Sequence, residues 1–106
     1  MKIDIHNHPD WHGYNRERFV ANMDKLGIDK TVLLSWDCPI DEVDPHIIDV
    51  MVPQAGKMTC PIPFQNALPY VEKYPDRFYL GYAPDPRTLD ACDRLKAFKK
   101  LYDIKI

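Results

Sequence analysis

The chain has 106 residues, of which 45% are hydrophobic and 28% charged, and its formal net charge is −2. This length corresponds to one domain, and the near-neutral charge argues against a nucleic-acid partner. Its apolar runs are too short to predict a membrane span, and the first residues do not form a signal-peptide pattern. Cys38, Cys60 and Cys92 are widely spaced and form neither a disulfide framework nor a CxxC site, which predicts a cytoplasmic, reduced protein.

The first predicted element is a short strand that ends in His6 and His8. Residues two apart in a strand point to the same face, so these imidazoles would project side by side, with Ile3 and Ile5 packing on the other face. Asp4 shares the histidine face and would either accept a hydrogen bond from an imidazole or form a buried polar link between strands. Neutral imidazole suits zinc, iron and nickel, so the pair predicts half of a divalent-metal site, with zinc as the expected ion.

A helix and a second strand follow the histidines. Apolar residues recur at helical spacing between Asn15, a plausible N-cap, and Gly27, which is suited to end the helix. The continuous apolar run at residues 31–35 is typical of a strand buried on both faces of a parallel sheet. Strand, helix and strand together predict a βαβ unit.

Three aromatic residues near the predicted strand ends are candidate substrate contacts. Trp11 and His12 lie in the turn after the histidine pair, and Trp36 directly follows the second strand. Each has a simpler alternative, because His12 would also suit a solvated loop and Trp11 would also suit packing beneath the segment that follows Trp36.

Residues 36–63 form a long segment with five of the ten prolines and several acidic side chains. A loop of this length within a compact domain is usually functional or disordered. It would leave from the same end of the sheet as the histidine pair, at the catalytic face, and its apolar residues 47–52 suggest a short helix or flap.

The remaining chain predicts a helix over residues 64–74, a strand over 78–82, a helix over 89–101 and a fourth strand from residue 103. The order βαβαβαβ indicates an α/β fold with a parallel sheet, either doubly wound or part of a (β/α)₈ barrel. A whole barrel needs about 250 residues. Because the sequence stops inside an apolar strand, we expect it to be a piece of a longer protein.

Three stretches carry a resemblance to a known family. Residues 2–8 (KIDIHNH) resemble the HxH strand that opens the amidohydrolase superfamily. Residues 27–33 (GIDKTVL) and residues 74–87 (YPDRFYLGYAPDPR) are similar to the branch of amidohydrolase-related proteins that contains metal-dependent decarboxylases. The resemblance covers essentially the whole chain, as the N-terminal part of that family.

This resemblance implies that residues 1–106 are the N-terminal portion of a (β/α)₈ TIM barrel, with a divalent metal at its C-terminal mouth. His6 and His8 inherit the role of metal ligands, and the family's further histidine and aspartate would lie beyond Ile106. The implied activity is that of a metal-dependent hydrolase acting on a small-molecule substrate through metal-activated water, and the 106 residues alone are expected to be inactive.

Three alternatives remain open at this point. The first is a metal-dependent non-oxidative decarboxylase of the same superfamily. The second is a PHP-type phosphoesterase, although such proteins usually have Asp-Gly where this chain has Trp11-His12-Gly13. The third is a non-catalytic, metal-binding half-barrel that forms a homo-oligomer by pairing its open sheets.

Overall fold

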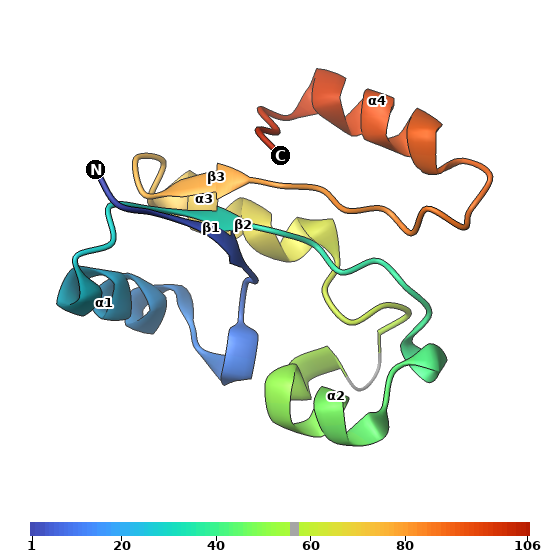
Figure 1. Cartoon of the computed structure of the whole chain (residues 1–106), viewed down its shortest axis with the longest axis horizontal. Helices are drawn as coiled ribbons and strands as arrows, with labels where there is room; N and C mark the ends of the chain where they lie inside the picture. Colours follow the sequence, from blue (N-terminus) through green and yellow to red (C-terminus); the bar gives the residue numbers. More distant parts are fainter. Residues whose placement is uncertain (56–57) are drawn as a thin grey trace.

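The computed structural model describes residues 1–55 and 58–106, and the strands of its sheet run parallel in the order β1-β2-β3 (Figure 1). This confirms the predicted α/β class. The described elements, apart from short 3₁₀ turns, are β1 (Ile3–Asn7), α1 (Arg16–Leu26), β2 (Lys30–Leu33), α2 (Pro45–Met51), α3 (Leu68–Lys73), β3 (Phe78–Leu80) and α4 (Ala91–Leu101).

Helix α1 begins and ends where its sequence predicts. The side chain of Asn15 accepts a hydrogen bond from the backbone N–H of Arg18 at 2.9 Å, which satisfies one of the unpaired donors of the first turn. Gly27 ends the helix with a φ of 65°, a left-handed conformation that glycine adopts without steric cost. The helix buries Phe19 and Met23 and brings the chain directly to the start of β2.

Strand β1 contains an irregularity that the sequence did not predict. Asp4 pairs with Thr31 and Asn7 pairs with Leu33, so three steps along β1 match two along β2. Such a bulge interrupts the alternation of side chains. As a result Asp4 and Asn7 line the same hollow beside α1, and the prediction that Asp4 shares a face with both histidines is wrong.

An apolar core joins the sheet to α1, α3 and the chain around α4. Phe78 of β3 lies at its centre, with the rings of Phe19 and Tyr70 edge-on at 5.5 and 5.4 Å. The side chain of Phe98 from α4 packs against the same core. The buried members are Phe19, Met23, Leu33, Phe64, Ala67, Tyr70, Phe78, Leu80, Tyr82 and Ile104.

In place of the predicted fourth strand, the chain from residue 103 makes a short parallel pairing with β3. Leu80 and Ile104 form an isolated bridge, and the backbone N–H of Tyr82 donates to the carbonyl of Ile106 at 2.9 Å. The chain after α4 therefore lies next to β3, and the pairing extends the order of the sheet.

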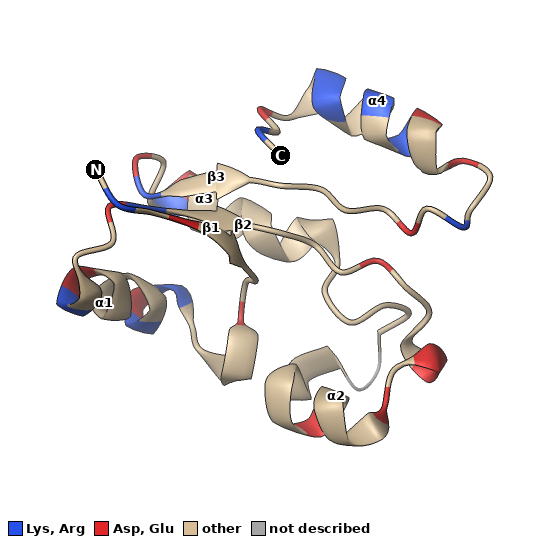
Figure 2. Cartoon of the chain, in the orientation of Figure 1, with Lys and Arg blue, Asp and Glu red and all other residues tan. Residues whose placement is uncertain are grey.

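The segment of residues 36–63 contains α2 and a second apolar cluster, which confirms the predicted short helix. Acidic side chains gather along this part of the chain (Figure 2), and the side chain of Asp44 caps α2 by accepting from the N–H of His46. Ile48, Val52 and Ala55 are buried in the cluster against Ile62.

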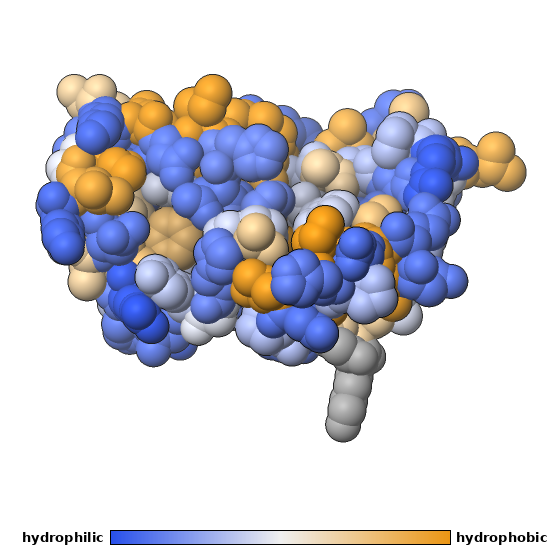
Figure 3. All heavy atoms as spheres, turned by 60° about the horizontal axis from the view of Figure 1, so that its bottom comes forward, coloured by the Kyte–Doolittle hydropathy of each residue, from blue (hydrophilic) through white to orange (hydrophobic). Residues whose placement is uncertain are grey.

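Apolar side chains also remain on the surface. Ile5 on β1 is 69% exposed and Ile3 is 40% exposed, so the prediction that both pack is wrong for the described part of the chain. On the α2 side of the molecule, apolar side chains form small patches between hydrophilic ones (Figure 3). None of the helices in residues 1–55 and 58–106 combines the length and the apolar character that crossing a membrane requires.

Candidate metal centre

The two histidines of the first strand lie in contact at its carboxyl end. The ring centroids of His6 and His8 are 5.3 Å apart, with the rings nearly perpendicular. His6 is exposed and His8 is half-buried. The structure therefore brings this predicted pair together, with one ring open to solvent and the other held by its surroundings.

A carbonyl from the neighbouring strand orients His8. Its Nδ1 lies 2.8 Å from the backbone oxygen of Leu34, directly after β2. A carbonyl oxygen only accepts hydrogen bonds, so Nδ1 carries the proton and Nε2 keeps its lone pair. Metal-binding histidines are commonly oriented by such a hydrogen bond through the second ring nitrogen.

The protonation state of His8 suits the same role. Burial lowers the pKa of His8 below its ordinary value, with a smaller lowering from the adjacent His6, while the hydrogen bond to Leu34 acts in the opposite direction. A lowered pKa keeps the imidazole neutral at physiological pH, and only the neutral ring binds a metal ion.

The donor set of the pair fits a divalent ion of intermediate softness, such as zinc. His6 and His8 would supply two nitrogen ligands. Within residues 1–55 and 58–106, no group of three or more His, Cys, Asp or Glu side chains is arranged to hold an ion. A zinc site with the usual three or four protein ligands would need further donors.

Asp4 does not orient an imidazole in this structure. Its carboxylate accepts from the side-chain amide of Asn7 at 2.9 Å and from the backbone N–H of His6 at 3.2 Å. Neither of the two predicted roles is observed, because both partners of the carboxylate belong to its own strand.

The turn after the histidines places Trp11 beside His8 and His12 beside Trp11. The ring of Trp11 lies 5.0 Å from His8 and 5.6 Å from His12. Asp10 and His12 both have positive φ values, 57° and 54°. Residues other than glycine adopt this conformation at a cost of about 1–2 kcal/mol, so other contacts must hold the turn.

Tyr70 of α3 is the main contact that holds this turn. Its hydroxyl accepts from the backbone N–H of Asp10 at 2.9 Å and lies 2.8 Å from Asp10 Oδ1 and 3.2 Å from the carbonyl of Tyr14. Burial raises the pKa of Tyr70, so the hydroxyl stays protonated. Sequence reasoning missed this residue, because its partner lies 60 positions earlier.

Trp11 and His12 line a cavity of about 250 Å³ between β1 and α1. Its walls combine apolar side chains of α1 with polar groups of the strands, among them the fully buried Thr31, whose hydroxyl lacks a hydrogen-bond partner in the described chain. The rings of His6 and His8 do not line this cavity, so it is adjacent to the candidate metal centre rather than part of it.

Trp36 has no ring contact with His6 or His8 among the described aromatic contacts. It packs against the apolar cluster of the α2 segment, as Trp11 does, and it lines a shallow hollow with residues that follow β3. Trp11 therefore packs on the α2 segment, which was one of its two predicted positions. A substrate contact by Trp36 stays a prediction.

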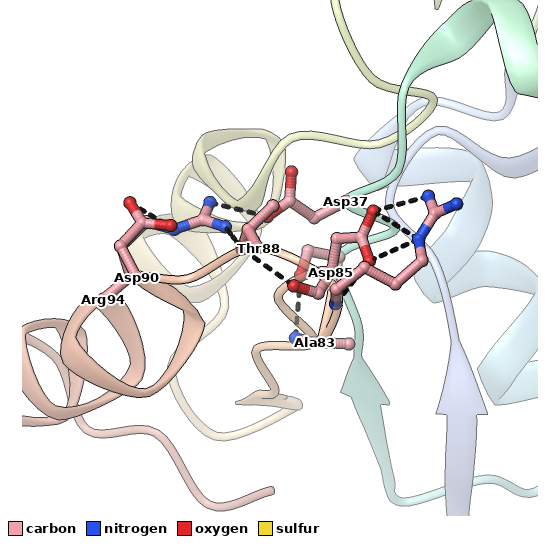
Figure 4. Close-up of polar contacts among 8 residues, drawn as sticks. Asp37, Ala83, Asp85, Thr88, Asp90 and Arg94 are labelled. Atoms are coloured by element: carbon pink, nitrogen blue, oxygen red, sulfur yellow. Dashed lines mark hydrogen bonds and ion pairs between the residues drawn. The ribbon is translucent and has the colours of Figure 1, made fainter.

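Charged side chains connect the loops that follow β2 and β3 (Figure 4). Arg94 of α4 pairs with Asp37 at 2.8 Å and donates to Thr88 at 2.8 Å. Arg87 pairs with Asp85 at 2.6 Å, and its guanidinium lowers the pKa of this nearly buried carboxyl to about 2. The Arg94–Asp37 pair joins the segment after β2 to α4, whereas the Arg87–Asp85 pair lies within the loop after β3.

Comparisons with models of known protein families, with curated proteins and with solved structures find no match.

Proposed function

We propose that the chain is the N-terminal part of a metal-dependent hydrolase of the amidohydrolase superfamily, which acts on a small-molecule substrate. The observation that carries this proposal is the contact between His6 and His8 at the end of β1, with His8 oriented by the carbonyl of Leu34. Two imidazoles from one strand, one of them oriented by the next strand, would supply two of the ligands of a metal centre.

The arrangement of the sheet supports a (β/α)₈ barrel as the parent fold. The strands follow the order of the sequence, and the pairing of Leu80 with Ile104 continues that order. Side chains from α1, α3 and α4 enter one shared core, whereas a doubly wound sheet divides its helices between two faces. In barrels the active site lies at the carboxyl ends of the strands, where His6 and His8 lie here.

His6 and His8 would hold a divalent ion, which would supply the Lewis acidity that activates water for hydrolysis near neutral pH. The chain's own residues have simpler tasks. His8 stays neutral because it is half-buried, and Leu34 fixes which of its nitrogens is free. The ring of Trp11 packs beside His8 and contributes to its partial burial. Trp11, His12 and Trp36 are proposed to contact the substrate.

Zinc binding to the purified chain tests the proposal. His6→Ala and His8→Ala should each weaken zinc affinity at least tenfold in a competition titration with a chromogenic chelator, because each removes one of two ligands. His46→Ala is the matched control, since His46 is an exposed histidine on α2 and should bind zinc like the wild type. Equal affinities in all four proteins would refute the proposal.

The same titration should depend on pH. Protons compete with the metal for imidazole nitrogen, so zinc affinity should fall as the pH drops below the ordinary histidine pKa of about 6.5. His8 binds a proton less readily than an exposed histidine, and affinity should therefore persist to a lower pH than in a short unfolded peptide of residues 2–8. Identical pH profiles for the chain and the peptide would contradict this role of burial.

A further inference from the structure

Cys38 and Cys60 lie on two backbone segments that face each other. Trp36 and Ile62 form an antiparallel bridge in which each N–H donates to the other's carbonyl, at 2.8 and 3.2 Å. Each cysteine lies two residues from this bridge, since Cys38 follows Trp36 and Cys60 precedes Ile62. Beyond them, the N–H of Ile40 donates to the carbonyl of Thr59 at 3.0 Å, which holds the segments together on the other side.

The spacing expected for such a position suits a disulfide. In a continuous antiparallel ladder, residues equally far from a bridge face each other with Cα atoms about 4.5–5.5 Å apart. Here the pairing is limited to the Trp36–Ile62 bridge, and the bond from Ile40 to Thr59 keeps the two segments close on the other side of the cysteines. Disulfides span Cα separations of about 4.4–6.8 Å. Cys38 and Cys60 therefore lie on adjacent segments between these two contacts, although 22 positions separate them in the sequence.

Two further observations place the thiols near each other. Both side chains are half-buried and line the same cavity, together with Asp37 and Arg94. Burial and the charge of Asp37 raise the pKa of Cys60, and Cys38 adds a smaller contribution that depends on proximity. The third cysteine, Cys92, is exposed on α4 and does not line this cavity.

We propose that Cys38 and Cys60 are a redox-active dithiol that forms a disulfide by exchange with a low-molecular-weight disulfide such as oxidised glutathione. The thiolate of one cysteine attacks a glutathione sulfur, breaks that S–S bond and forms a mixed disulfide with release of one glutathione. The second cysteine then attacks the protein sulfur of the mixed disulfide and releases the other glutathione. The two cysteines are oxidised by two electrons, and two glutathione thiols take up their protons.

The new bond would join the two ends of the segment that carries α2. Trp36 lies two residues from Cys38, and α2 belongs to the cluster on which Trp11 packs. Oxidation would thus fix this segment to the carboxyl end of the sheet, whether or not the chain binds a metal. The raised thiol pKa values make exchange slow at neutral pH and faster as the pH rises.

Incubation of the folded chain with reduced and oxidised glutathione tests the proposal. After remaining thiols are blocked with N-ethylmaleimide, peptide mass spectrometry should find Cys38 linked to Cys60, with a loss of two hydrogens. Cys92→Ser is the matched control and should form the same bond. A folded wild-type chain in which Cys38 and Cys60 carry only glutathione or N-ethylmaleimide would overturn the proposal.

A trivalent arsenical provides a second measurement that needs no oxidation. Phenylarsine oxide bridges two thiols at a separation close to that of a disulfide, so it should protect both Cys38 and Cys60 from alkylation in the wild type and in Cys92→Ser. In Cys38→Ser or Cys60→Ser, phenylarsine oxide should protect the remaining thiol of the pair from alkylation at least tenfold less than it does in the wild type. Equal protection in the single variants and the wild type would show that the thiols react separately and would overturn the pairing.

Discussion

At the scale of single residues, Tyr70 shows how one hydroxyl can hold a strained turn. The side chain is 1% exposed, and its hydroxyl contacts both the backbone and the carboxylate of Asp10. The turn that begins at Asp10 carries Trp11 and His12, and its two non-glycine residues with positive φ depend on such contacts. Tyr70 thereby connects the hydrophobic core to the surroundings of the candidate metal centre.

Replacing this hydroxyl should destabilise the fold without leaving a large cavity. Tyr70→Phe should lower the free energy of unfolding in urea by about 1–2 kcal/mol, because Asp10 loses its buried partner. Tyr79→Phe is the matched control, since the ring of Tyr79 lies over Lys30 and is half-exposed, and it should change stability by less than about 0.5 kcal/mol. Equal losses in both variants would contradict the role assigned to Tyr70.

At the scale of elements, the two ends of α1 are set by contacts between residues that are close in the sequence. The side chain of Asn15 caps its first turn and Gly27 ends it, and both features could be predicted from the sequence because each involves residues within one turn of each other. The end of the helix matters for the site, because α1 forms one wall of the cavity lined by Trp11 and His12.

Removal of the N-cap side chain of Asn15 should lower the stability of the fold, and a substitution that keeps an acceptor oxygen should restore it. Asn15→Ala should reduce the free energy of unfolding by about 1 kcal/mol, because the N–H of Arg18 loses its acceptor. Asn15→Asp retains an acceptor oxygen and favours the positive end of the helix dipole, so it should restore stability to the wild-type value. Chemical denaturation monitored by circular dichroism compares the three proteins, and a loss in Asn15→Asp as large as in Asn15→Ala would contradict the cap.

Strand β1 shows the opposite case. The alternation of its sequence predicts Asp4, His6 and His8 on one face, yet the pairing with β2 includes a bulge that turns Asp4 toward Asn7. A bulge depends on how the neighbouring strand pairs, which is not encoded in the local pattern. The position of the histidine pair at the strand end could be predicted, but the partners of each polar side chain could not.

At the scale of the whole molecule, one aromatic group holds the sheet and the helices together. Phe78 is buried between Phe19 of α1 and Tyr70 of α3, with Tyr74 at a greater distance. Edge-on rings of this kind add to the stabilisation from apolar burial. Phe78 therefore joins β3 to both α1 and α3 through direct ring contacts.

Truncation of this ring should have the largest effect of the changes considered. Phe78→Ala should lower the free energy of unfolding by about 3–5 kcal/mol, which is a large share of the about 5–15 kcal/mol available to a domain. Leu89→Ala is the control, because Leu89 is fully exposed and should alter stability by less than about 0.5 kcal/mol. A urea midpoint for Phe78→Ala close to that of Leu89→Ala would contradict this description of the core.

The sequence by itself determined the order of strands and helices, the ends of α1 and the histidine pair at the end of the first strand. These features follow from periodicity and capping, which act over a few neighbouring residues. Only the tertiary structure decided the bulge in β1, the contact of Tyr70 with Asp10, and the bridge between Trp36 and Ile62 that brings the segments of Cys38 and Cys60 together. Each of these joins residues from separate segments, so it depends on the path of the chain in space and not on local sequence.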